Sequence, residues 1–366
     1  NAVAATNEGL IERLFVIGCL SERYADELRA EIPEVDDYFG ARDLSGVVKA
    51  LGAQYDITST ARELSTPKHY AYLKISEGCN WRCGYCAIPG IRGKHTSVPM
   101  DQLLAEAESL VAKGVKEIMV IAQDTTYYGV DLYGKRCLAE LLEKLCRIEG
   151  LEWIRLHYAY PTDFPQEVID TMAREPKICK YLDIPLQHIS DNQLSLMHRR
   201  HTKAEAIDLL ARLRKAMPDM AIRTTLLVGY PNESAEDFAE LCDFVREQRF
   251  ERLGVFPYSE EEGTFSAEKL SDNVPERVKN YRAEEIMRIQ ADISLEKNSE
   301  RIGRVERVIV DERRGDYYIA RSQYDSPEVD EEIYIEASGK RLFRGRFYNV
   351  RITDADQYDL FAQLVK

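Results

Sequence analysis

Short apolar runs alternate with amphipathic stretches between residues 65 and 260. The runs are rich in β-branched or aromatic residues, and the stretches between them, such as Met100–Val111, carry apolar residues three and four positions apart. This alternation predicts βα units and a parallel sheet. Six strands are predicted, at Tyr70–Ser76, Glu117–Ala122, Trp153–Tyr158, Tyr181–Leu186, Ile222–Val228 and Leu253–Tyr258.

The pattern changes on both sides of this region. Residues 276–302 have the character of a charged helix, and the first 60 residues hold one predicted strand, Leu14–Ile17, followed by a helix and a tail. Beyond Gly303, alternating runs predict a small antiparallel barrel with strands at Arg304–Val310, Tyr317–Arg321, Glu332–Ile335 and Phe347–Ile352. We therefore expect an α/β protein with domains at 1–62, 65–295 and 296–366.

Unusual polar groups follow directly after the predicted strands of the central region. Ligands of parallel barrels bind at the C-terminal ends of the strands, so these groups are expected to share one face. In chain order they are Cys79, Cys83 and Cys86, then Gln123 and Asp124, His157, Gln187 and His188, Gly229 and Ser259.

The three cysteines have the spacing C-x-x-x-C-x-x-C. A 4Fe-4S cluster usually takes four thiolates, so a loop that offers three leaves one iron free to bind a group that is not protein. The alternative is a structural zinc site, for which His95 could supply the fourth ligand.

This cysteine motif, with Tyr85 just before its last cysteine, resembles that of the radical S-adenosylmethionine (AdoMet) enzymes. The resemblance implies a partial (β/α)6 barrel, which agrees with the six predicted strands. It also implies that AdoMet binds the free iron and is cleaved reductively to methionine and a 5′-deoxyadenosyl radical. The expected AdoMet-binding residues are Tyr85, Gln123, Asp124, Gln187, His188 and Gly229.

Further blocks resemble the methylthiotransferases among these enzymes. Gly18-Cys19-Leu20 with Glu22-Arg23-Tyr24 is similar to the end of that family's N-terminal domain, and the C-terminal barrel resembles a TRAM domain. The resemblance implies that Cys19 is one of three ligands of a second, auxiliary 4Fe-4S cluster. The chain begins with Asn1 rather than Met, and the other two cysteines are expected upstream of it.

The turn after the fifth strand, Gly229-Tyr-Pro-Asn232-Glu233, departs from the Gly-x-Pro-Gly-Glu that this family often has. Asn tolerates a positive φ, so we expect the turn to survive. A glycine at position 229 would suit a backbone that lies close to a ligand.

Within the family, one branch modifies an adenosine of tRNA, and the RimO-type branch modifies an aspartate of the twelfth small-subunit ribosomal protein. The segment Tyr324–Glu336 holds six carboxylates and no Lys or Arg, and the whole chain carries a net charge of −14. Both favour a basic protein over nucleic acid as the partner. The segments Gln187–Ser190 and Val350–Leu360 also resemble the corresponding segments of the RimO-type branch. A tRNA enzyme and a noncatalytic metal-binding or RNA-binding module are the alternatives.

Several residues have simpler interpretations. Gln187 and His188 could cap a buried strand end, and Arg199 and Arg200 could lie on a solvated helix face or near the AdoMet carboxylate. We expect His157 to be a hydrogen-bonded barrel residue. The cysteines outside the motif, Cys137, Cys146, Cys179 and Cys242, are expected to be small buried hydrophobic residues.

The expected compartment is the cytoplasm. No stretch approaches about 18 uninterrupted apolar residues, and no basic region followed by an apolar one opens the chain, so neither a membrane span nor a secretion signal is predicted. A reducing compartment keeps the eight cysteines as thiols or metal ligands. A reducing system is expected to supply the electron for AdoMet cleavage.

Overall fold

The largest sheet is an open, all-parallel sheet of six strands. The computed structural model describes residues 2–56, 62–337, 339 and 341–365, and its strand order is β10-β9-β8-β7-β6-β3. Because β3 and β10 are unpaired edges, the sheet is a partial barrel, as predicted. Its strands are β3 (Tyr70–Lys74), β6 (Glu117–Ile121), β7 (Trp153–Leu156), β8 (Ile178–Asp183), β9 (Ala221–Val228) and β10 (Arg252–Pro257).

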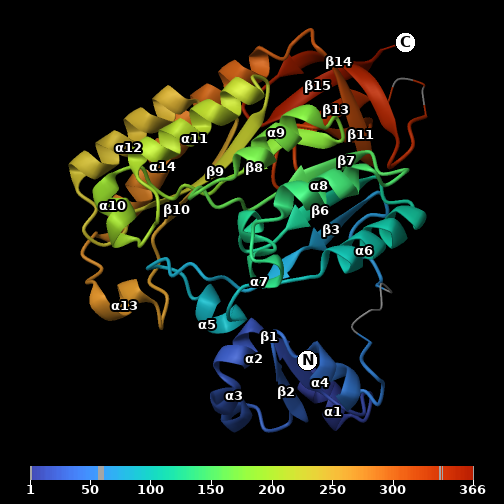
Figure 1. Cartoon of the computed structure of the whole chain (residues 1–366), viewed down its shortest axis with the longest axis vertical. Helices are drawn as coiled ribbons and strands as arrows, with labels where there is room; N and C mark the ends of the chain where they lie inside the picture. Colours follow the sequence, from blue (N-terminus) through green and yellow to red (C-terminus); the bar gives the residue numbers. More distant parts are fainter. Residues whose placement is uncertain (1, 57–61, 338, 340, 366) are drawn as a thin grey trace.

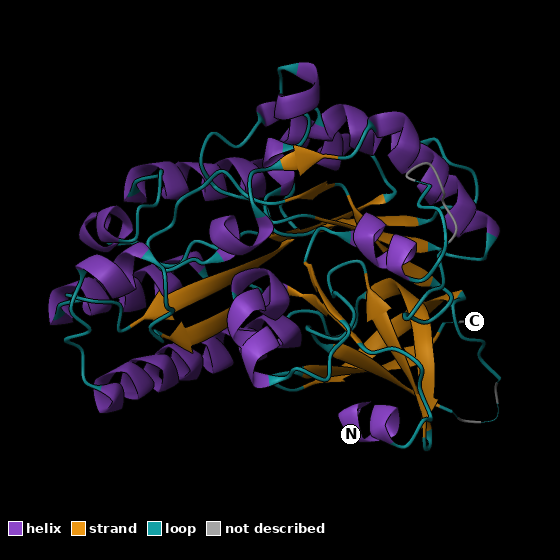
Figure 2. Cartoon of the chain, turned by 90° about the horizontal axis from the view of Figure 1, so that it is seen from below, coloured by secondary structure: helices purple, strands orange, loops and turns teal. Residues whose placement is uncertain are grey.

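Helices cover the outer face of this sheet (Figure 1), and Figure 2 shows them around its outside. Ala71 and Leu73 of β3 point outward into the main core and are fully buried, whereas Tyr70 and Tyr72 alternate with them and face inward. The helices are α6 (Met100–Ala112), α8 (Leu138–Cys146), α9 (Gln166–Arg174), α11 (Lys203–Ala216), α12 (Ala235–Gln248) and α14 (Glu276–Ser299). Shorter helices are α5 (Ile88–Arg92), η1 (Thr125–Tyr127), α7 (Val130–Tyr133), α10 (Asp191–Leu196) and α13 (Phe265–Lys269).

The fourth strand begins three residues earlier than the sequence predicts. It ends at Asp183, and the apolar run that continues through Leu186 lies outside the ladder. Pro185 explains the end of the strand, because proline has no N–H to donate to a neighbouring strand. Gln187 therefore lies in a loop, although it still forms an isolated bridge with Leu226 of β9.

The N-terminal segment contains one more strand than predicted. β1 (Phe15–Gly18) pairs in parallel with β2 (Asp37–Gly40), a strand of four residues that the pattern missed within the predicted tail. Around this pair lie α1 (Ala2–Asn7), α2 (Cys19–Arg23), α3 (Ala25–Glu31) and α4 (Leu44–Ala50). Arg23 and Tyr24 bind Glu261 and Glu262 in the loop after β10, which ties this segment to the partial barrel.

The C-terminal strands close into a barrel in the order β11-β12-β13-β15-β14. The predicted antiparallel barrel is confirmed, and one of its five strand pairs, β13 with β15, is parallel. β15 was not predicted, although its first four residues alternate between partly buried and buried. The strands are β11 (Val305–Arg314), β12 (Tyr317–Ser322), β13 (Glu332–Glu336), β14 (Phe347–Ala355) and β15 (Asp359–Leu364).

The two flanking units lie at opposite ends of the partial barrel (Figure 1). Ile309 of the C-terminal barrel packs with Trp153, Cys179 and Ala221, which stand at or near the first residues of β7, β8 and β9. The N-terminal segment instead contacts α5, which follows the three cysteines at the other end of the sheet. One end of the partial barrel is therefore closed by the C-terminal barrel, and the other carries the cysteine loop.

Candidate functional site

The cysteine loop lies between two short strands, β4 (Ser76–Glu77) and β5 (Thr96–Ser97), and tight contacts fix its path. The Cys79 amide donates to the Gly93 carbonyl at 3.0 Å, and the Cys86 amide donates to the Cys83 carbonyl at 3.1 Å. At Gly84, a Cβ atom would lie 2.7 Å from the Tyr230 hydroxyl oxygen, so only glycine fits there. The loop is thus held by the protein itself.

All three cysteines of the loop are free and partly exposed. Burial raises the pKa of the Cys79 thiol to about 12, and burial also raises the pKa of Cys86. Without iron these thiols stay protonated at neutral pH. Iron must displace their protons, so cluster assembly is expected to be favoured at higher pH.

The structure does not support the alternative of a single zinc ion among the residues that it describes. Tetrahedral Zn–S bonds bring ligand sulfurs to about 3.8 Å from one another. Within the described residues, no three His, Cys, Asp or Glu side chains converge in that way. A 4Fe-4S cluster binds each thiolate on a different iron and does not require such convergence. His95, the fourth ligand of the zinc alternative, is buried, and its Nε2 lies 3.1 Å from the Ser97 Oγ.

Arg199 is buried beside the cysteine loop. One guanidinium nitrogen donates to the Tyr85 hydroxyl at 3.3 Å and to the Cys83 Sγ at 3.6 Å, and the other donates to the Pro185 carbonyl at 2.6 Å. Its Nε has no hydrogen-bond partner, and among the described residues no carboxylate pairs with it. Arg199 is therefore not on a solvated helix face. Arg200 is exposed, as that interpretation requires.

An aromatic stack connects Arg199 to the cysteines. Its guanidinium lies 4.2 Å from the centre of the Tyr160 ring, and Trp81 stacks on the same ring at 4.3 Å. The Tyr160 hydroxyl lies 3.8 Å from the Cys83 Sγ. Sequence reasoning missed Trp81, which stands inside the cysteine motif, and Tyr160, which follows His157 by three residues.

Asp124 organises this stack. Its Oδ2 accepts a hydrogen bond from the Trp81 indole at 2.7 Å, and its Oδ1 accepts from the Thr126 amide and hydroxyl. Gln123 donates to Glu77 at 3.0 Å, while its Oε1 is buried without a partner. Gln123 thus keeps a free acceptor for a ligand, whereas both Asp124 oxygens are engaged by the protein.

His188 and Gln187, which follow β8, also differ in how completely the protein surrounds them. His188 is fully buried, its Nδ1 accepts from the Ser190 amide at 3.0 Å, and its Nε2 lies 3.8 Å from Glu233, which fits the strand-end interpretation. Gln187 is only partly buried and has a φ of 72°, a rare conformation for a residue other than glycine. Tyr85 remains next to Cys86 and Arg199, as its assignment to the cofactor requires.

Gly229 is required by packing. It has a φ of 72°, and a Cβ atom there would lie 2.3 Å from the Cγ of Lys279 on α14. The close neighbour seen in the structure is a side chain of the protein, and the expected contact of Gly229 with a ligand stays a prediction. Asn232 adopts a φ of 65°, which confirms that Asn can replace the family's glycine in this turn.

Cys19 begins α2 and faces the partial barrel. Arg92, the last residue of α5, donates one hydrogen bond to the Cys19 Sγ at 3.1 Å and another to Glu77 at 3.2 Å. Arg92 therefore links Cys19 to Glu77, which stands two residues before Cys79. This location fits a ligand of a second cluster that opens toward the same end of the barrel.

The remaining residues singled out by the sequence have structural roles. The His157 Nε2 lies 3.0 Å from the Ser326 hydroxyl, and its Nδ1 lies 3.8 Å from Asp183, so it is a hydrogen-bonded barrel residue. Three of the other cysteines are buried, namely Cys137, Cys179 and Cys242, whereas Cys146 is only partly buried. His201 was not singled out, yet it is buried beside Arg199 with neither ring nitrogen hydrogen-bonded, and burial lowers its pKa to about 3.

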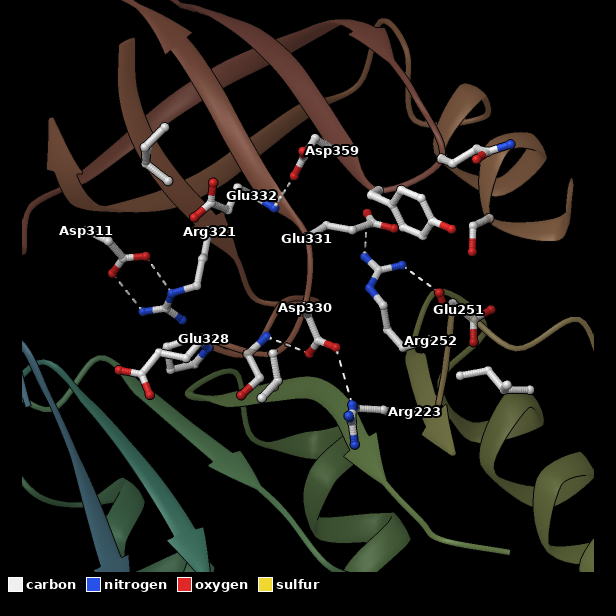
Figure 3. Close-up of a pocket in the computed structure, with 18 of the residues that line it drawn as sticks. Arg223, Glu251, Arg252, Asp311, Arg321, Glu328, Asp330, Glu331, Glu332 and Asp359 are labelled. Carbon is white, nitrogen blue, oxygen red and sulfur yellow. Dashed lines mark hydrogen bonds and ion pairs between the residues drawn. The ribbon is translucent and has the colours of Figure 1, made fainter. Parts of the chain in front are cut away.

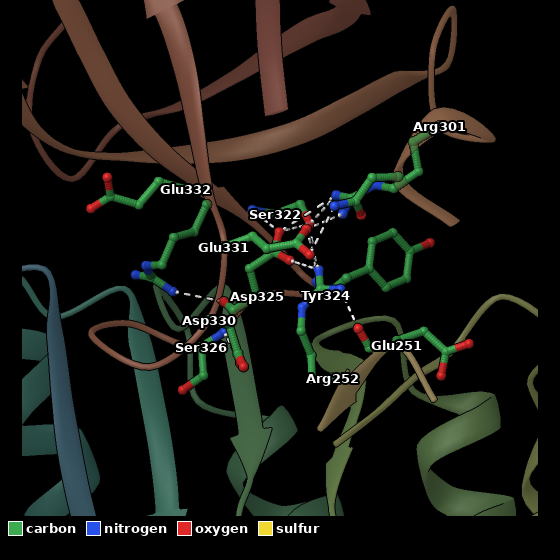
Figure 4. A network of polar contacts seen from close by, with 12 residues as sticks. Glu251, Arg252, Arg301, Ser322, Tyr324, Asp325, Ser326, Asp330, Glu331 and Glu332 are labelled. Atoms are coloured by element: carbon green, nitrogen blue, oxygen red, sulfur yellow. Dashed lines mark hydrogen bonds and ion pairs between the residues drawn. The ribbon is translucent and has the colours of Figure 1, made fainter. Parts of the chain in front are cut away.

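The acidic segment 324–336 is mostly an internal interface. Asp325 and Glu331 bind Arg252 of β10 at 2.6 and 2.8 Å (Figure 4), and Asp330 pairs with Arg223 of β9 at 3.4 Å. These three of the segment's six carboxylates are buried, so they offer no surface to a partner. The prediction that this segment is a docking surface is therefore wrong for its three buried carboxylates. The sequence did not show this, because their arginine partners lie far away along the chain.

A cavity of about 660 Å³ lies between the C-terminal barrel and the two sheet edges. Tyr70 of β3 and Arg252 of β10 line it, with Glu328, Glu332 and Asp359 from the C-terminal barrel around it (Figure 3). It opens at the end of the sheet away from the cysteines. No helix among the described residues is long and apolar enough to cross a membrane.

Comparison with known proteins identifies both main units. The sequence pattern of the Radical SAM superfamily matches residues 73–245, and that of the TRAM domain matches residues 302–365. The chain is 53% identical over 362 residues to the ribosomal protein uS12 methylthiotransferase RimO of Christiangramia forsetii, covering 99% of this chain and 80% of that protein. It is 53% identical over 358 residues to the protein of that name from Flavobacterium johnsoniae, covering 98% of this chain and 82% of that protein.

One solved structure has a similar fold at low identity. The cobalamin-dependent AdoMet radical enzyme OxsB with aqua-cobalamin bound superimposes with a TM-score of 0.51 at 13% identity. The match covers 78% of this chain and 45% of that protein. At this identity the similarity concerns the fold alone.

Proposed function

Because the chain belongs to the RimO family of ribosomal protein uS12 methylthiotransferases, we propose that it attaches a methylthio group to the β-carbon of an aspartyl residue of uS12. The observation that carries this proposal is the identity of about half of all residues over nearly the whole chain, which includes the cysteine loop and the TRAM domain. The enzyme would act in the cytoplasm. The alternative of a noncatalytic module is wrong, since the family is a family of transferases.

Cys79, Cys83 and Cys86 would hold a 4Fe-4S cluster with one open iron. When bound, that cluster would supply the electron that cleaves AdoMet and so generates a radical able to take hydrogen from the substrate carbon. The protein contributes the rigid loop: Gly84 and the Cys79 amide fix its backbone. Tyr160, whose ring stacks on Trp81, contacts the Cys83 Sγ through its hydroxyl at 3.8 Å.

Arg199 would bind the carboxylate of AdoMet. A buried guanidinium without a carboxylate partner is costly, and a bound carboxylate would offset that cost. Its two hydrogen bonds toward Cys83 and Tyr85 aim it at the loop that would carry the open iron. The free acceptor of Gln123 and the partly buried Gln187 would face other polar groups of the cofactor.

Cys19 would bind the auxiliary cluster together with two cysteines upstream of Asn1. That cluster would hold the sulfur to be transferred, a further AdoMet would supply the methyl group, and an external reducing system would supply electrons. The contact of Cys19 with Arg92 keeps this site on the cysteine side of the barrel. Transfer between two sites requires that they open into one space, and this arrangement supports that.

The proposal is tested by deleting the gene and comparing digests of the small-subunit proteins by mass spectrometry. One aspartyl peptide of uS12 should be lighter by a methylthio group, and tRNA nucleosides should be unaltered. A change in an adenosine of tRNA, with uS12 unaffected, would establish the alternative branch. In the full-length protein, Cys19→Ala should still cleave AdoMet but form no methylthio product, whereas Cys137→Ala should retain both activities.

A further inference from the structure

Tyr158 is a strained and exposed aromatic residue directly after β7. Its φ is 54°, a conformation that non-glycine residues rarely adopt, and half of its surface is exposed. Neither property helps the fold, because glycine would remove the strain and a smaller residue would expose less apolar surface. Such outliers are kept where the protein uses them.

The strain is enforced from both sides of the residue. The Tyr158 carbonyl accepts hydrogen bonds from the Thr125 amide at 3.1 Å and from its hydroxyl at 3.3 Å. Before it, His157 is held by Ser326 of the TRAM domain, and after it the Tyr160 amide donates to Asp124 at 3.3 Å. The backbone of Tyr158 is therefore fixed by contacts that its own side chain does not make.

The Tyr158 ring lies beside that of His157, with the two ring centres 5.9 Å apart, and half of the residue is open to solvent. Burial raises the pKa of Tyr72, and Glu328 and Tyr158 are among the neighbours that raise it further. Tyr72 lies on the inner face of the edge strand β3, where its ring meets that of Tyr70 at 6.4 Å. Within the described residues the Tyr158 hydroxyl has no hydrogen-bond partner, so this phenol donor is available to a ligand.

We propose that Tyr158 is a positioning residue for the protein substrate: its ring packs against the substrate segment and its hydroxyl donates a hydrogen bond to an acceptor of that segment. This rests on the proposed function. Hydrogen transfer requires the substrate carbon to be held close to the radical, and a rigid aromatic residue is an efficient anchor. Tyr160, two residues further on, contacts Cys83. One short segment would therefore fix the position of the substrate relative to the cysteine loop.

The test compares Tyr158→Gly and Tyr158→Phe with a matched control, Asp163→Gly. Asp163 also has a positive φ, 51°, but it is exposed in the same loop. Glycine accepts this conformation without strain, so neither Gly variant should melt below the wild type. In the iron-loaded full-length protein, Tyr158→Gly should release at least fivefold more 5′-deoxyadenosine per methylthio group formed. The iron-free protein should bind uS12 at least fivefold more weakly.

Tyr158→Phe, which keeps the ring and loses the hydroxyl, should show a smaller change of the same sign, and Asp163→Gly should match the wild type. An unchanged product ratio and an unchanged Kd in Tyr158→Gly would overturn the inference. Equal changes in Tyr158→Gly and Asp163→Gly would also overturn it, since they would reflect loop freedom alone. Absence of methylthio product from the wild type would instead overturn the proposed function, and the Kd would still decide the role of Tyr158.

Discussion

Arginine side chains are buried at both ends of the partial barrel, but the groups around them differ. At the TRAM end, the fully buried Arg155 binds Glu117 at 2.8 Å, and Arg321 binds the other oxygen of Glu117 at 2.8 Å. At the cysteine end, Arg199 is also buried, yet its neighbours are a thiol, a phenol, a carbonyl and an aromatic ring.

This difference separates a structural end from a reactive end. Burial works to raise the pKa of Glu117, but Arg321 and Arg155 outweigh it and hold that pKa below its ordinary value, so the charges at the TRAM end satisfy one another. A buried cation without an anion is instead typical of a site that awaits a charged ligand. The barrel therefore keeps TRAM docked at one end, and under the proposed function the unpaired Arg199 at the other end would bind the carboxylate of the cofactor.

The largest expected effect is at the reactive end. Cys83→Ala should abolish 5′-deoxyadenosine formation, a loss of at least about a thousandfold, because two thiolates do not hold the cluster with one open iron. Chromatography of the anaerobic reaction measures it. Cys146→Ala, at a partly buried position on α8, is the matched control and should retain activity. Persistent AdoMet cleavage in Cys83→Ala would remove the basis for calling this end reactive.

At the structural end, Glu117→Ala should lower the free energy of unfolding by about 3–5 kcal/mol, because it leaves the buried guanidinium of Arg155 without a carboxylate, while Arg321 keeps only Asp311. Denaturant unfolding measures the loss. Glu152→Ala is the control: Glu152 pairs with Arg307 across the same domain boundary at 2.8 Å, but both side chains are exposed. It should cost less than about 1 kcal/mol. Equal costs for the two variants would contradict the view that burial of the pair matters.

Arg199→Met should weaken cofactor binding strongly and change the free energy of unfolding little. It should raise the Kd for AdoMet about 10- to 100-fold, as expected for the loss of hydrogen bonds to a charged group. The free energy of unfolding should fall by no more than about 1 kcal/mol, since an unpaired buried charge is removed together with its hydrogen bonds. Equilibrium binding to the iron-loaded protein measures the first, and Arg200→Met, at an exposed position, is the control. A loss of stability as large as that of Glu117→Ala would make Arg199 a structural residue.

Local sequence patterns were sufficient for the sheet and the cysteine loop. The six strands follow from short apolar runs, and Cys79, Cys83 and Cys86 are adjacent enough for their spacing to indicate a cluster. The exceptions were local too: Pro185 ended β8 early, and β2 was too short to stand out.

Contacts between distant residues were beyond such reasoning. The segment 324–336 looks like an acidic surface because Arg252, its main partner, is more than 70 residues away. The position of Arg199 against Tyr160 and Cys83 depends on three separate loops, so its sequence neighbourhood suggested a solvated helix face equally well. The identity of a charged residue was visible in the sequence, whereas its partner was not.

The smallest expected effect sharpens the description of the structural end. Burial, and then the neighbouring Asp325, raise the pKa of Glu331 to about 7 against the attraction of Arg252. A carboxyl whose pKa is raised on folding stabilises the protein fully below its unfolded value near 4.5, and this contribution is lost as the pH rises through 7. Glu331→Gln keeps the uncharged form at every pH. Relative to the wild type, it should therefore gain roughly 2–3 kcal/mol in the free energy of unfolding between pH 5 and pH 8.

Denaturant unfolding at several pH values measures this difference. Glu332→Gln, at the next and more exposed position, where Glu332 pairs with Arg314 at 2.7 Å, is the matched control and should track the wild type. A difference for Glu331→Gln that stays constant with pH would show that Glu331 is charged throughout. In that case Arg252 and Arg301 would neutralise both Asp325 and Glu331, and the TRAM end would have no titrating group in this pH range.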